Sequence, residues 1–99
     1  MNLELILAPE AEAEITDARE WYDERSPGRG TDFLRAVEVA IAAIRENPFQ
    51  YQVVWKHYRR VGLGSRYPYG LFYGVSDQVI RVVACVHGKR NPEVWKERT

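Results

Sequence analysis

The chain is poor in the residues that build disulfides and metal sites. Its 99 residues include one cysteine, Cys85, and two histidines. It cannot form an internal disulfide, and a zinc site would need carboxylates to complete its ligand set. A lone cysteine fits a reducing cytoplasm. The sequence therefore predicts a cytoplasmic protein with no metal and no other cofactor.

Long hydrophobic runs and common catalytic motifs are also missing. No apolar run approaches the ~18 residues that a membrane span requires. The N-terminal stretch MNLELILAPE carries Glu4 where a signal peptide would have a basic start. The patterns GxGxxG, GxSxG, CxxC and HExxH and the P-loop are absent as well. We expect no membrane contact and no chemistry that depends on these motifs.

What is present is an ordinary globular composition with an uneven charge distribution. Hydrophobic residues make up 45% and charged residues 28% of the chain, which excludes disorder. The length predicts one domain, residues 1–99. The net charge is zero, but residues 1–50 carry −6 and residues 51–99 carry +6. The two halves therefore present opposite fields if they fold onto different faces, although solvation of the helices explains the acids equally well.

The first half predicts a strand and two helices. Apolar and other residues alternate at the start, with Leu3, Leu5 and Leu7 set against Asn2, Glu4 and Ile6. Pro9 followed by an acidic turn favours a helix from about 9 to 25. A turn over 26–30 follows, and Thr31 is the expected cap of a second helix that ends at Asn47-Pro48. Two helices joined by so short a turn are antiparallel neighbours.

The second half predicts strands. The segments 51–55, 58–63, 67–75 and 79–86 are rich in aromatic and β-branched residues. Residues 76–78 suit a hairpin turn, and the nearly continuous apolar segment 79–86 is typical of a central strand. Asn91-Pro92 opens a short helical turn that carries Trp95. The sequence thus predicts an α+β fold of order β-α-α-β-β-β: an N-terminal strand, an antiparallel helical hairpin and a mainly antiparallel sheet that includes the first strand.

Basic and aromatic residues alternate in two clusters of the second half. The first is His57-Tyr58-Arg59-Arg60 followed by Arg66-Tyr67-Pro68-Tyr69, a pattern that can hold phosphates and stack on bases. An exposed strand with half-buried tyrosines explains it as well. The second is HGKR, residues 87–90, at the end of the apolar strand, where a histidine can move protons and an arginine can grip an oxyanion. Trp95 suits an anchor of the C-terminal segment.

Taken in order, these features resemble the RelE/ParE superfamily of bacterial type II toxins, and within it ParE more than RelE. The matching features are Pro9 with an acidic helix ending in Trp21-Tyr22, Gly30 and Phe33 before Asn47-Pro48, and then Arg60, RYPYGLFYGV and HGKRNPEVW. The resemblance spans nearly the whole chain. It implies a growth-inhibiting toxin, of the kind also called plasmid stabilisation proteins, that a cognate antitoxin neutralises in a toxin-antitoxin hetero-oligomer.

The superfamily implies two targets, DNA gyrase for ParE-like and the ribosome with mRNA for RelE-like members. The RelE pattern places an arginine where this chain has Gly70 and a C-terminal tyrosine where it has Trp95, whose indole is no acid or base at neutral pH. A RelE-like endoribonuclease would then depend on Arg90, His87 and Arg66 as catalytic residues. A ParE-like gyrase inhibitor has no catalysis of its own. A relative that has lost toxicity and only binds an antitoxin or regulates DNA is a third reading.

The resemblance also implies binding residues for the target or the antitoxin. These are Arg59, Arg60, Tyr67, Lys89 and Trp95. An antitoxin of this kind would lie over the apolar and basic surface as an amphipathic helix or strand. Acidic antitoxin residues would speed association with the positively charged half.

Overall fold

The computed structural model describes residues 3–99. Its elements are, in chain order, β1 (Glu4–Leu7), α1 (Pro9–Arg25), α2 (Arg29–Glu46), β2 (Val53–Trp55), β3 (Tyr58–Gly62), β4 (Tyr69–Ser76), β5 (Val79–His87) and α3 (Glu93–Lys96). The predicted α+β fold and its short C-terminal helical turn are confirmed. Asn2, which the expected alternation of the first strand includes, lies outside the described residues. No helix within residues 3–99 is long and apolar enough to span a membrane.

One mixed sheet contains all the strands, in the order β1-β5-β4-β3-β2. β1 pairs in parallel with β5, and the other neighbours pair antiparallel. The four extended segments predicted in the second half are each strands, so the sheet has one strand more than the order β-α-α-β-β-β counts. The apolar β5 is interior, between β1 and β4, as its sequence predicts.

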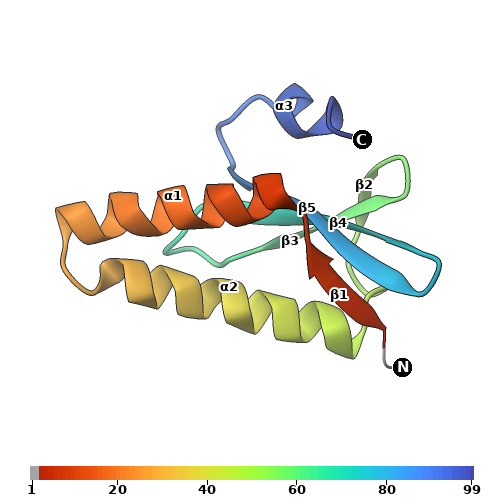
Figure 1. Ribbon diagram of the computed structural model, residues 1–99, viewed down its shortest axis with the longest axis horizontal. Coiled ribbons are helices and arrows are strands. Elements are labelled where there is room, and N and C mark those ends of the chain that lie inside the picture. The colour runs from red at the N-terminus through yellow and green to blue at the C-terminus, as the bar shows by residue number, and fades with distance from the viewer. Residues whose placement is uncertain (1–2) are drawn as a thin grey trace.

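The sheet separates two apolar clusters. α1 and α2 lie side by side over one face, which we call the helix face, where Phe33 and Ile44 pack on Leu71, Tyr73 and other sheet residues (Figure 1). α3 lies over the opposite face, which we call the α3 face. There Trp95 packs with Phe72, Ala84 and Val86. Because side chains alternate along a strand, successive residues of β3 and of β4 point to opposite faces of the sheet.

Helix α2 begins earlier than the sequence predicts. Thr31 was the predicted cap, but α2 begins at Arg29, and its N-cap is Gly28 in a left-handed conformation (φ 90°). The Asp23 carboxylate of α1 accepts a hydrogen bond from the backbone N–H of Gly30 at 2.7 Å. Asp23 thereby caps the first turn of α2, the role predicted for Thr31. A Cβ on Gly30 would lie 2.5 Å from the Arg19 carbonyl oxygen, so only glycine permits this close approach of the helices.

Candidate functional site

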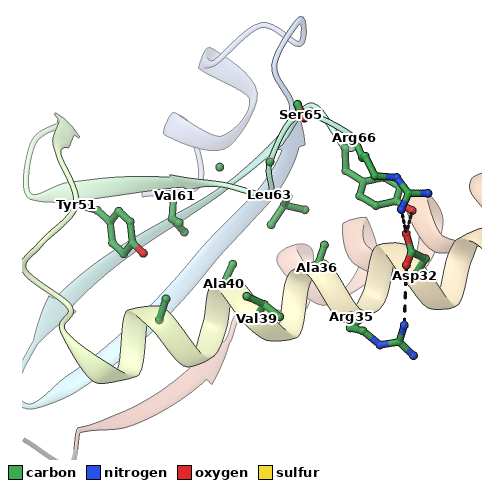
Figure 2. A pocket seen from close by; sticks show the side chains of 14 residues that line it. Asp32, Arg35, Ala36, Val39, Ala40, Tyr51, Val61, Leu63, Ser65 and Arg66 are labelled. Carbon is green, nitrogen blue, oxygen red and sulfur yellow. Dashed lines mark hydrogen bonds and ion pairs between the residues drawn. The ribbon is translucent and has the colours of Figure 1, made fainter.

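A groove of about 570 Å³ runs between α2 and the segment that links β3 to β4. Figure 2 shows its walls: α2 contributes Ala36, Val39 and Ala40, and the opposite side contributes Tyr51, Val61 and Leu63. Val39 is 65% exposed, so this wall offers an apolar side chain to the surroundings. We call this hollow the α2 groove. The middle of the groove can bind apolar side chains, and the charged side chains lie at one end of it.

That end is an ionic cluster around Asp32. The carboxylate accepts a hydrogen bond from the Tyr67 hydroxyl at 2.5 Å and pairs with Arg66 at 3.1 Å and Arg35 at 3.9 Å (Figure 2). The hydrogen bond from Tyr67, aided by Arg66, holds the pKa of Asp32 below its ordinary value. Burial, and then the bond to Asp32, raises the pKa of Tyr67. Arg66, which has no nearby acid in the sequence, is therefore paired with an acid from α2.

The Arg59 side chain forms hydrogen bonds with the backbone of its own chain. Its guanidinium donates to the backbone carbonyls of Tyr51 at 2.6 Å and Phe49 at 3.2 Å. These bonds hold the loop between α2 and β2 against β3. Arg59 therefore satisfies two carbonyls of its own chain, and its hydrogen bonds give it a structural role.

A second pocket, of about 370 Å³, opens on the α3 face. It is lined by Arg60 from β3, Phe72 from β4, Val86 and His87 from β5, and Gly88, Arg90, Pro92 and Trp95 from the C-terminal segment. We call it the cationic pocket. Three basic residues among the predicted site residues come together here: Arg60 from β3, His87 from the end of β5 and Arg90 from the segment that follows it. No acidic side chain lines this pocket.

A glycine on the adjacent strand makes room for Arg60. The Nε atom of Arg60 lies 2.6 Å from the point that a Cβ on Gly70 would occupy, and its Cζ lies 2.9 Å from that point. The guanidinium is 5.9 Å from the centre of the Phe72 ring. Gly70 is the position where the RelE pattern has an arginine. Here Arg60 fills the space above that position from the next strand.

His87 is oriented by the turn that follows it. Its Nδ1 accepts the backbone N–H of Lys89 at 3.0 Å, and its ring meets Tyr69 edge-on with 5.2 Å between the centroids. Because Nδ1 is an acceptor, a neutral ring carries its proton on Nε2. Nε2 can then donate a hydrogen bond but cannot take up a proton. This tautomer suits binding of an oxygen ligand and does not suit a general base.

The other predicted site residues are buried or lie outside the cationic pocket. Trp95 is 1% exposed and stacks on Phe72 with centroids 4.5 Å apart, so it anchors α3 as its sequence suggested. Tyr67 is 3% exposed and presents little surface to a partner. Lys89 is exposed beside the cationic pocket. Arg66 lies at the α2 groove and not with His87 and Arg90, so the structure does not bring the three catalytic candidates together.

Sequence reasoning missed a pair that ties the C-terminus to α1. Arg98 and Glu14 form a two-pronged ion pair, with N–O distances of 3.0 and 2.8 Å. Glu14 also accepts the backbone N–H of Cys85, and Arg98 donates to the Val83 carbonyl. These side chains satisfy the edge of β5 beyond the end of β1. Nothing local marks the pair, since its members stand 84 positions apart. Among residues 3–99 no group of three or more His, Cys, Asp or Glu side chains could hold a metal ion.

Comparison with solved structures shows the fold. A solved structure described as the chromosomal ParDE TA system from P. aeruginosa superimposes with a TM-score of 0.76, covering 87% of this chain and 96% of that chain. The identity is 12%, so this likeness shows the fold. No curated protein matches the chain.

The family follows from the sequence match. The family model described as ParE toxin of type II toxin-antitoxin system, parDE, matches residues 5–92. The chain belongs to this family and is a toxin of the type II toxin-antitoxin class.

Proposed function

We propose that this protein inhibits growth by binding DNA gyrase in the cytoplasm and that a cognate antitoxin neutralises it. The observation that carries the proposal is the ParE family match over residues 5–92. The two halves of the chain carry opposite charge, which suits a protein that works by binding. The surfaces available for binding are the α2 groove and the cationic pocket.

The chemistry of the cationic pocket supports binding over catalysis. An endoribonuclease needs a group that removes the proton of the ribose 2′-OH. His87 uses Nδ1 to accept the Lys89 N–H, and Arg66 pairs with Asp32 at the α2 groove. The convergence of Arg60, His87 and Arg90 is the one feature that favours the alternative, a ribosome-dependent endoribonuclease acting on mRNA. Neutral overall charge works against ribosome binding.

The α2 groove supports docking of the antitoxin as an amphipathic helix. Its walls are apolar along most of their length, and exposed Val39 lies within it. At the end stand Arg35 and Arg66, which share a single acid, Asp32. A helix with an apolar stripe and an acid near one end would therefore match both parts of the groove. Val39→Glu is expected to weaken antitoxin binding at least tenfold while the isolated toxin stays folded.

Gyrase supercoiling with the purified protein tests the proposed target. We expect lost supercoiling and accumulation of cleaved plasmid, both reversed by the antitoxin. Arg90→Ala should weaken gyrase binding itself, whereas exposed Arg81→Ala should leave it within threefold. If a large excess of folded protein leaves supercoiling intact but cleaves mRNA on ribosomes, the nuclease reading replaces this one.

A further inference from the structure

The cationic pocket contains two arginines that lack an ionic partner. Within residues 3–99 the ion pairs involve Arg35, Arg66, Lys96 and Arg98, and neither Arg60 nor Arg90 takes part. Both line the same pocket of about 370 Å³. We propose that this pocket is a carboxylate-binding site that receives an acidic side chain of the antitoxin. The inference rests on the proposed function for the source of the carboxylate and names a second anchor, separate from the α2 groove.

Arg60 is an exposed residue of the cationic pocket, and its side chain reaches over the adjacent strand. Its guanidinium lies over Gly70, where a methyl group would contact Nε at 2.6 Å, and its Cζ atom is 5.9 Å from the centre of the Phe72 ring. The planar fork of a guanidinium matches a carboxylate. His87 adds a donor at Nε2. A pocket with two guanidinium groups, an imidazole N–H and no acid is therefore complementary to one carboxylate.

The surroundings of the pocket add positive potential. Exposed Lys89 stands next to the pocket. The acid of α3, Glu93, pairs with Lys96 at 3.7 Å. An approaching acidic segment therefore meets an excess of positive charge around the entrance, which speeds association.

The shape of the α3 face favours a protein side chain over a nucleic-acid backbone. α3 covers this face through Trp95, which packs among Trp55, Tyr58 and Phe72. A nucleic acid binds best along a continuous track of cations. Here the covered centre interrupts such a track, while the pocket between Arg60 and Arg90 admits a single side chain.

The test uses the isolated protein and a blocked hexaglutamate peptide as probe. NMR would follow the side-chain Nε–H signals of Arg60 and Arg90 during titration at fixed low salt, with the single-stranded oligonucleotide dT6 in a parallel titration. We expect the peptide to shift both signals and to bind more tightly than dT6. The double variant Arg60→Gln/Arg90→Gln should bind the peptide at least tenfold more weakly. The matched control, Lys56→Gln/Arg81→Gln, removes the same charge from exposed positions outside the pocket and should stay within threefold.

Gly70→Ala supplies a second variant that keeps every charge. The three atoms nearest to the added methyl group belong to the end of the flexible Arg60 side chain, so the protein should stay folded while the guanidinium moves aside. We expect peptide affinity to fall at least threefold. Equal losses in the two double variants, tighter binding of dT6, or unmoved Arg60 and Arg90 signals would each overturn the carboxylate site. The gyrase assay uses no peptide, so failure of the proposed function is scored separately.

Discussion

The Glu14–Arg98 pair allows a sharp test of how the C-terminal segment is held. The side chains are only 13% and 20% exposed, and both oxygens of Glu14 accept from Arg98. Glu14 also accepts the Cys85 N–H at 3.0 Å. Glu14→Ala removes these three hydrogen bonds and leaves a largely buried arginine without its partner. Glu14→Gln keeps the acceptor oxygen and removes the charge.

The magnitude follows from burial. Removing one partner of a fully buried pair costs about 3–5 kcal/mol, and the residual exposure here lets water compensate in part. We therefore expect Glu14→Ala to cost about 2–4 kcal/mol and Glu14→Gln about 1–2 kcal/mol. In a chain of this size 1 kcal/mol shifts Tm by roughly 4–8 °C. Exposed Glu20→Gln on the same helix is the control, with an expected change below about 0.5 kcal/mol.

Urea unfolding followed by circular dichroism measures these values in a double-mutant cycle with Arg98→Ala. We expect a coupling free energy of about 1–2 kcal/mol between the two side chains. A coupling below about 0.3 kcal/mol would refute the reasoning, because the ion pair would then contribute nothing that its separate halves do not. In that case the packing of Trp95 and the bond from Arg98 to the Val83 carbonyl would hold the C-terminal segment.

Three further predictions concern other sites. Gly30→Ala should cost about 2–4 kcal/mol in thermal unfolding, because its Cβ meets a backbone oxygen that cannot move aside; a loss under about 0.5 kcal/mol would contradict the close approach. Arg59→Gln should cost about 1–2 kcal/mol and leave hexaglutamate binding unchanged, since it clamps two loop carbonyls; weakened binding would make it a contact residue. Burial, with a further contribution from Glu14, raises the pKa of Cys85 to about 12 from 9.0. Its stabilisation is therefore complete below pH 9 and lost as the pH rises towards 12. Between pH 9 and 10.5 the wild type should lose about 1–2 kcal/mol relative to Cys85→Ala in urea titrations, and parallel pH profiles would contradict this.

Local patterns predicted the elements well because their causes are local. Pro9 and the acidic first turn fix the start of α1, and Asn47-Pro48 stops α2 at Glu46. The start of α2 was predicted wrongly because Asp23 of the preceding helix caps Gly30, and a cap supplied by another helix leaves no mark beside Thr31. The register shift at Phe72/Tyr73 in the β4–β5 pair depends on pairing across the sheet, so alternation within one strand cannot show it.

The candidate site was predicted in part for the same reason. His87 and Arg90 line one pocket because His87 ends the buried strand β5 and Arg90 follows closely after it, and their nearness in the sequence made this placement predictable. Arg60 joined them only through the pairing of Gly62 with Gly70, which aligns β3 beside β4. The acid that pairs with Arg66 comes from α2, so no inspection of the sequence around Arg66 could reveal it.

The arginines of the positively charged half divide by what already satisfies them. Arg59 donates to two carbonyls, and Arg66 and Arg98 each pair with an acid from the helical hairpin. These bonds stabilise the fold, and a partner that binds these three arginines would first have to break them. Within the described residues Arg60 and Arg90 have no ion pair, so an incoming carboxylate breaks no such bond when it pairs with them. Two unpaired arginines that line one pocket are therefore the first positions to change in testing where the partner binds.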